Sequence, residues 1–154
     1  MSLLDVESVL DERIDSYDLE IFRDNYLKQC TRGSPCAEVV FAYASALIRS
    51  SKTDVREGVD ILENLVKNES RESNQRDYIY YLSLGYARLS DYDRALAYID
   101  ILLKSEKENR QVSELKEIIE KKMRKDGFIG AAIVGGALAV VAGGLFAIMK
   151  AVKN

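Results

Sequence analysis

The chain has 154 residues, of which 47% are apolar and 31% charged, a composition typical of one compact globular domain rather than of a disordered chain. It contains no histidine, which excludes Ser-His and Cys-His nucleophilic pairs, histidine-ligated zinc and imidazole general bases. Its 22 basic and 25 acidic residues give a formal net charge of −3, so the chain has no excess of positive charge for binding nucleic acid.

Apolar residues recur near every 3.6 positions through most of the chain, and helix start signals separate the runs. The single proline and the concentration of glycine near the C-terminus leave few turn signals for a many-stranded sheet, so the sequence predicts an all-α fold. We expect seven helices, with approximate bounds 3–14, from 16 onward, 35–49, 54–68, 74–89, 91–104 and 109–124. The expected N-caps of the last five are Ser34, Asp54 with Glu57 in a capping box, Ser73 or Asn74, Asp91 and Asn109.

The sharpest change in composition lies at residues 127–149, where 23 consecutive residues carry no charged or polar side chain. As a helix, this run is about 34 Å long, which is enough to cross a hydrocarbon core of about 30 Å. We therefore expect a cytosolic domain over residues 1–126, a transmembrane helix over 127–149 and a short basic tail over 150–154. Because only five residues follow the apolar run, the pattern is typical of a tail-anchored protein. A buried core helix rich in alanine and glycine is the alternative interpretation.

Basic residues flank the predicted anchor on both sides. In chain order they are Lys121, Lys122, Arg124, Lys125, Lys150 and Lys153. The larger number lies on the domain side, which agrees with a domain that faces the cytosol. A short anchor rich in glycine and alanine, with basic flanks, favours mitochondrial or peroxisomal membranes. Binding of anionic lipid headgroups is an alternative role for the cluster before the anchor.

Small residues recur at every fourth position of the predicted anchor and share one face of its helix. They are Gly127, Ala131, Gly135, Ala139, Gly143 and Ala147. Such a ridge lets a second helix approach closely, so one hypothesis is a homo-oligomer formed through the tail. The other hypothesis is that a mildly hydrophobic anchor tolerates small residues without any partner.

The predicted soluble domain repeats at a spacing of 37 residues. This shift superposes Tyr43 on Tyr80, Leu47 on Leu84 and Leu62 on Ile99. The second unit carries the tetratricopeptide pattern at Leu82, Ser83, Tyr86, Tyr92, Ala95 and Ile99, and the first unit keeps Ala46 and Gly58 as its close-packing small residues. Two units are fewer than a stable stack needs, so we expect segments 1–30 and 109–124 to cap a tetratricopeptide-like helical bundle at its two ends.

The first helix of each repeat pair is expected to line a concave face, and side chains spaced around it would project into a groove. The expected lining is Val40, Tyr43, Leu47, Tyr80, Leu84, Ala87 and Arg88. This mostly apolar set suits a peptide or an amphipathic helix as the bound partner. Two alternatives stay open, namely that several of these residues belong to the core and that the chain's own N-terminal arm, residues 1–15, lies in the groove.

Motifs in both units and in the tail carry a resemblance to a known family. The motifs are Gln75-Arg76-Asp77-Tyr78, Tyr80-Tyr81-Leu82, Gly85-Tyr86, Leu47-Ile48-Arg49-Ser50, Lys125-Asp126-Gly127 and Ala132-Ile133-Val134-Gly135-Gly136. Together with the two-unit bundle, they resemble the mitochondrial fission 1 protein family over essentially the whole chain.

The resemblance implies a tail-anchored adaptor of the outer mitochondrial membrane, and also of peroxisomes, whose bundle faces the cytosol. Such a protein would recruit a dynamin-related GTPase, directly or through other adaptors, to promote organelle division. The resemblance implies no catalytic residue and no cofactor. Cys30 and Cys36 have neither a histidine partner nor Cys-x-x-Cys spacing, so we also expect no metal site.

Three other classes of function remain as alternatives. A membrane-anchored tetratricopeptide receptor for chaperones or precursor proteins needs several basic or amide side chains in its groove, and only Arg88 is evident. A tail-anchored regulator of cell death would not need the repeat. Carboxylate pairs such as Asp91/Asp93 and Glu117/Glu120 could serve an enzyme, but solvated helix faces and caps explain them more simply.

Overall fold

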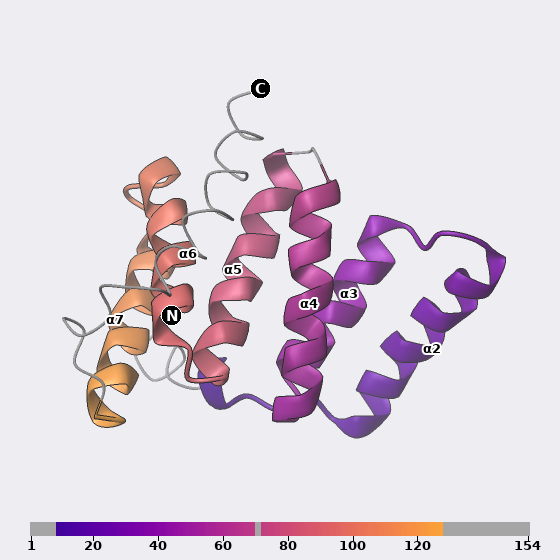
Figure 1. Cartoon of the computed structure of the whole chain (residues 1–154), viewed down its shortest axis with the longest axis horizontal. Helices are drawn as coiled ribbons and strands as arrows, with labels where there is room; N and C mark the ends of the chain where they lie inside the picture. Colours follow the sequence, from indigo (N-terminus) through magenta and orange to yellow (C-terminus); the bar gives the residue numbers. More distant parts are fainter. Residues whose placement is uncertain (1–8, 70–71, 128–154) are drawn as a thin grey trace.

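The computed structural model describes residues 9–69 and 72–127, and all regular structure in these ranges is helical (Figure 1). The helices are α2 (Ser16–Arg32), α3 (Ala37–Ile48), α4 (Lys52–Asn68), α5 (Glu72–Arg88), α6 (Tyr92–Ser105) and α7 (Arg110–Lys125). Residues 9–11, in the arm before α2, are also helical. The prediction of an all-α fold is confirmed for the described part of the chain.

Each described helix packs against the next one along the chain, and α3 also contacts α5. Figure 1 shows the helices side by side, from α2 at one edge of the molecule to α6 and α7 at the other. The pairs α3–α4 and α5–α6 are the two predicted repeat units, with α2 and α7 at the ends. The two-unit bundle with capping helices is therefore present, because short turns force successive helices to run antiparallel.

Helix caps agree with the sequence at two starts and differ at the other three. One of these is α5, which already begins at Glu72, before the predicted Ser73 or Asn74. Asp91 and Asn109 are N-caps as predicted, and they accept hydrogen bonds from the backbone N–H groups of Arg94 (3.4 Å) and Val112 (3.2 Å). The prediction of Ser34 as a cap is wrong, because α3 begins only after Cys36, whose extended backbone donates its N–H to the side chain of Gln29 at 3.0 Å.

The predicted capping box of α4 is displaced by one helical turn. Ser51, rather than Asp54, is the N-cap, and its Oγ accepts the N–H of Asp54 at 3.3 Å. Asp54 is instead the third residue of the helix, and its carboxylate accepts hydrogen bonds from the hydroxyls of Ser50 (2.6 Å) and Ser51 (2.8 Å). These two hydrogen bonds hold the pKa of Asp54 below its usual value, and the bond from Ser50 has the larger effect.

The caps also correct the spacing of the repeat. Ser51 and Asp91 occupy the same place in their units and lie 40 residues apart, rather than 37. The two shifts differ by three residues, which is close to one helical turn of 3.6, so both superpose apolar residues on apolar residues. With the corrected spacing, Leu84 is equivalent to Ala44 and Arg88 to Ile48.

Two clusters of buried side chains hold the bundle together. The main cluster runs from α3 to α7 and includes the fully buried Ile48, Leu62, Leu82, Ile99, Leu115 and Ile119. The smaller cluster joins α2 to α3 through Leu19, Tyr43, Ala46 and Leu47, with Phe22 and Tyr26 packed against it. The helix α2 is thus attached by a contact area separate from the main core.

Within residues 9–69 and 72–127, no helix is long and apolar enough to span a membrane. The predicted anchor falls outside the described residues except for Gly127, which lies in a turn after α7 with a φ of 82°. The other ridge residues, and Lys150 and Lys153 of the predicted basic tail, are outside the described residues as well.

Candidate binding site on the concave face

The first helices of the two units and α7 surround a cavity of about 190 Å³. Side chains from the arm, α3, α5 and α7 line it, namely Val9, Glu12, Ile48, Arg49, Tyr80, Tyr81, Leu84, Arg88 and Gln111. We call these nine residues the concave site. Its floor is apolar and its rim carries two arginines, so it can bind an apolar side chain beside an anionic or carbonyl group.

The helix α5 supplies more of the site than any other element, because Tyr80, Leu84 and Arg88 follow one another at four-residue intervals on one face. Leu84 is only 4% exposed and forms part of the floor. The half-buried Tyr80 accepts a hydrogen bond from Gln111 Nε2 at 3.5 Å, which links the wall on α5 to α7. Burial, with a smaller contribution from Tyr81, raises the pKa of Tyr80, so its hydroxyl is neutral at physiological pH.

Aromatic contacts build the wall between α3 and α5. Phe41 of α3 lies between Tyr78, at a ring-centroid distance of 5.2 Å, and Tyr81, at 5.4 Å with the rings edge to face. Tyr81 also meets Tyr80 edge to face at 5.8 Å. Edge-to-face pairs are favourable aromatic geometries, so these rings give the site a stiff apolar side.

Two arginines at the rim bind the N-terminal arm. Arg88 donates hydrogen bonds to the carbonyl oxygens of Glu12 (2.8 Å) and Ser50 (3.4 Å). Arg49 pairs with the carboxylate of Glu12 at 3.8 Å, and its own carbonyl accepts the N–H of Ile14 at 2.9 Å. Burial lowers the pKa of Arg88, and the positive charge of Arg13 lowers it further. Because the ordinary pKa of arginine is very high, the guanidinium still stays charged.

The arm also reaches the site with apolar side chains. Leu10 is 5% exposed and belongs to the main core cluster, and Val9 packs against that cluster. Of the described arm residues, Val9 and Glu12 thus line the concave site, and Leu10 joins the core beside it. Residues 1–8 are outside the described part of the chain.

The structure brings together three of the seven residues expected to line a groove, Tyr80, Leu84 and Arg88. Ala87 is fully buried in the main core, and Val40 is half-buried on α3 outside the cavity lining. Tyr43 and Leu47 are 4% and 0% exposed and pack in the cluster with α2. The 37-residue spacing pointed to them, whereas the 40-residue spacing points to Ile48, which does line the cavity.

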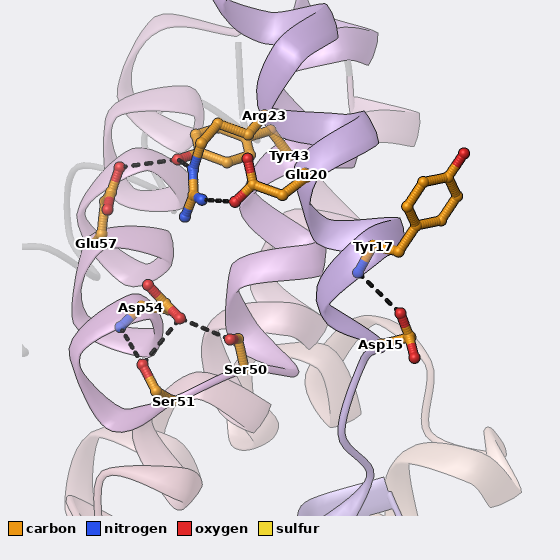
Figure 2. A network of polar contacts seen from close by, with 9 residues as sticks. All are labelled: Asp15, Tyr17, Glu20, Arg23, Tyr43, Ser50, Ser51, Asp54 and Glu57. Carbon is orange, nitrogen blue, oxygen red and sulfur yellow. Dashed lines mark hydrogen bonds and ion pairs between the residues drawn. The ribbon is translucent and has the colours of Figure 1, made fainter.

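A polar network gives Tyr43 a clear structural role (Figure 2). Its hydroxyl accepts a hydrogen bond from Arg23 Nε at 3.4 Å and donates one to Glu57 Oε1 at 3.1 Å. Its ring stacks on Tyr26 at a centroid distance of 4.8 Å. Because these partners come from α2 and α4, the side chain of Tyr43 ties three helices together.

Comparison with known proteins agrees with this architecture. A family model described as the Fis1 C-terminal tetratricopeptide repeat matches residues 76–128. The crystal structure of yeast Fis1 in complex with an Mdv1 fragment, which contains N-terminal extension and coiled coil domains, superposes with a TM-score of 0.67 at 34% identity. That superposition covers 75% of this chain and 89% of the yeast chain.

Two relatives are similar over nearly their whole length. The FIS1-related protein fis-2 of Caenorhabditis elegans is 45% identical over 141 residues, which cover 91% of this chain and 93% of that protein. The mitochondrial fission 1 protein of Rattus norvegicus is 42% identical over 139 residues, which cover 90% of this chain and 91% of that protein. The chain belongs to the mitochondrial fission 1 protein family.

Proposed function

We propose that this protein is an adaptor of the outer mitochondrial membrane that recruits fission machinery, including a dynamin-related GTPase, through its concave site. The observation that carries the proposal is the cavity itself, which has an apolar floor, an aromatic wall and two arginines at its rim. Such a surface suits a peptide or an amphipathic helix. Yeast Fis1, which shares this fold, forms a complex with a fragment that contains a coiled coil.

An adaptor of this kind acts by mass action and needs no catalytic group. By holding a partner at a membrane surface, it raises the local concentration of that partner and favours assembly there. Its contribution to division is then set by the affinity of the concave site and by the number of sites on the membrane. We assign no cofactor and no catalytic residue to this role.

The proposal includes attachment to the membrane by the apolar segment 127–149, with the bundle in the cytosol. The exposed Arg124 and Lys125 end α7 next to this segment, and a positive excess on the cytosolic side is the usual arrangement. Peroxisomal membranes are included, because the same short anchor with basic flanks suits them. Contact between two copies through the small-residue ridge belongs to the proposal as well.

Crosslinked pull-down from cells that lack the endogenous protein tests the site. The variant Tyr81→Glu places a charge on a half-buried lining residue, whereas a charge at Leu84, only 4% exposed, would disturb the core. The matched control is Tyr17→Glu, because Tyr17 is 73% exposed on α2 and lies outside the cavity lining. Wild type and control are expected to recover the GTPase or its adaptors, and Tyr81→Glu to lose most of them.

Mitochondrial length is scored in the same cells, and loss of recruitment is expected to leave long, undivided mitochondria. Equal recovery by Tyr81→Glu and wild type, with the variant folded, would move the partner to another surface. Recovery of chaperones or precursor proteins in place of fission proteins would instead support the receptor interpretation.

A further inference from the structure

The helix α7 ends in a tight turn directly before the apolar segment of the sequence. Its C-cap, Asp126, donates its backbone N–H to the carbonyl of Lys122 at 2.9 Å, and the N–H of Gly127 donates to the carbonyl of Arg124 at 3.1 Å. Gly127 has a φ of 82°, in the left-handed region where many helices end. Because other L-residues rarely adopt this conformation, the turn stops α7 at this glycine.

The backbone conformation alone explains why residue 127 is glycine. A Cβ atom at this position would meet nothing within 4 Å, so packing does not exclude a larger residue. The substitution Gly127→Ala therefore adds no clash and changes only the backbone preference. It tests the turn itself.

A tyrosine of α6 holds this turn against the bundle. The hydroxyl of Tyr92 donates a hydrogen bond to Asp126 Oδ2 and lies 3.5 Å from Ser90 Oγ. Tyr92 is 2% exposed and belongs to the main core cluster, whereas Asp126 is exposed. Burial, and then the bond to Asp126, raise the pKa of Tyr92, so its hydroxyl keeps the donated proton at physiological pH. A fixed, buried group thus binds the exposed C-cap of α7.

This contact lies at the last described side chain before the apolar segment. Met123 is 7% exposed and packs in the main core cluster, but the residues after it, 124–127, are exposed. Without the bond from Tyr92, Asp126 and Gly127 could pivot about the end of α7. With the bond, any pivot has to begin at Gly127, whose backbone is set by the turn.

We propose that Tyr92, Asp126 and Gly127 form an elbow that fixes the orientation of the bundle on the membrane, with Tyr92 as its positioning residue. The turn at Gly127 sets the angle between α7 and the segment that follows, and the bond from Tyr92 to Asp126 keeps the turn from pivoting. Neighbouring copies then present their concave sites in one orientation, which favours multivalent assembly because effective concentration depends on geometry. The inference rests on the proposed function, because it takes the segment after Gly127 to be the anchor.

The orientation is measured on the full chain in phosphatidylcholine vesicles by time-resolved energy transfer. Cys30→Ser leaves the exposed Cys36 as the single site for a donor dye, and an acceptor dye is attached to the lipid headgroups. Cys36 is the N-cap of α3, at the end of the bundle opposite to the end of α7 (Figure 1). The 16 residues of α7 span about 24 Å, so a tilt of about 30° would move this far end by about 12 Å.

Tyr92→Phe keeps the buried ring, removes the hydroxyl and should broaden the narrow distance distribution expected of the wild type. The matched control is Tyr86→Phe, because Tyr86 is 5% exposed and its hydroxyl also donates to a carboxylate, that of Glu63, outside the elbow. This control should lose stability in urea as Tyr92→Phe does, but keep the wild-type distribution. Asp126→Asn retains an acceptor oxygen and should behave as wild type, whereas Asp126→Ala should behave as Tyr92→Phe.

Gly127→Ala has a different expected signature, because it alters the angle and leaves the bond from Tyr92 to Asp126 in place. Alanine favours the right-handed helical conformation, which would prolong α7, so the mean distance should shift. Gly127→Asn should keep the wild-type mean, because asparagine tolerates the left-handed conformation.

A Tyr92→Phe distribution as narrow as that of the wild type, or equal broadening by Tyr92→Phe and Tyr86→Phe, would overturn the elbow. An unchanged mean for Gly127→Ala would overturn it as well. Flotation of the vesicles on a density gradient separates this inference from the proposed function. A chain that does not float with the vesicles would contradict the anchor, and the elbow with it. If the elbow variants behave as expected but Tyr81→Glu still recovers fission proteins, only the concave site of the proposed function is wrong.

Discussion

Gly58 shows how a single residue sets the distance between two helices. It lies inside α4, where a Cβ atom would stand 2.9 Å from the carbonyl oxygen of Ala44 and 3.0 Å from the Cβ of Leu47. Both atoms belong to α3, and one of them is backbone, so neither can move without shifting the helix. A hydrogen at this position is what lets α3 and α4 pack into one repeat unit.

We expect Gly58→Ala to lower the free energy of unfolding by about 1–2 kcal/mol. Overpacking a core typically costs about 1–3 kcal/mol, and the better helix propensity of alanine returns at most about 1 kcal/mol. Urea unfolding of the full chain in detergent, followed by helical circular dichroism, measures the difference. Asn64→Ala, at an exposed position of the same helix, is the control and should be neutral or slightly stabilising. A Gly58→Ala variant as stable as wild type would show that α3 yields at this contact.

At the scale of elements, α2 is the most weakly attached of the six complete helices. Leu19 is its only buried residue, and its outer face exposes Tyr17, Ile21 and Leu27 by 50% or more. The polar link from Arg23 through Tyr43 to Glu57 supplements this small apolar contact (Figure 2). Local opening needs less free energy where fewer apolar groups are buried, so α2 should open before α3 to α6.

Hydrogen exchange measured by mass spectrometry tests this expectation. Amides of α2 should exchange through an opening of lower free energy than those of α4 or α6. Tyr43→Phe removes the acceptor of the Arg23 hydrogen bond, which joins α2 to α3, and should lower the opening free energy of α2 by about 0.5–1.5 kcal/mol. Tyr17→Phe, at a 73% exposed position of α2, is the control. Uniform loss of protection across all helices would show that α2 opens only when the whole bundle unfolds.

Much of this architecture could be predicted from the sequence, because helix periodicity and the Asp91 and Asn109 caps are local signals. The spacing of the two units was not resolved, since shifts of 37 and 40 residues both match apolar with apolar. The caps decide between them, and Ser51 was missed because Asp54, three residues later, is an equally good capping residue by type.

Only part of the concave site could be predicted from the sequence, again because the spacing of the two repeat units was not resolved. Tyr80, Leu84 and Arg88 share one face of a helix whose bounds were nearly right. On α3, however, the 37-residue spacing selects Leu47 as the equivalent of Leu84, whereas the 40-residue spacing makes Ile48 the equivalent of Arg88. The contact of Arg88 with the Glu12 carbonyl joins residues 76 positions apart and involves a backbone atom, so no side-chain pattern could indicate it.

At the scale of the molecule, the two rim arginines of the concave site, Arg49 just after α3 and Arg88 at the end of α5, lie at the same end of the bundle as the C-terminal end of α7. The turns that contain Ser51 and Ser90, the N-terminal end of α2 and the C-terminal end of α7 meet at this end (Figure 1). Tyr92 at the start of α6 donates a hydrogen bond to Asp126, which fixes the last residues before Gly127 against the bundle. Under the proposed anchoring by the segment after Gly127, a partner bound at these arginines would therefore lie near the membrane.

The basic residues on the two sides of the anchor carry the last prediction, which concerns where the whole molecule goes. A fluorescent protein fused to residues 119–154 should coat mitochondria, because the apolar run is long enough to span a membrane and its basic flanks are expected to favour this membrane over the plasma membrane. Lys150→Glu together with Lys153→Glu should redirect the fusion to the endoplasmic reticulum, whereas Lys150→Arg with Lys153→Arg, which keeps both charges, should not. Fluorescence microscopy with markers for the two membranes measures the distribution. A diffuse signal from the unmodified fusion would contradict the predicted anchor. Unchanged targeting of the glutamate variant would show that Lys150 and Lys153 are not the targeting signal.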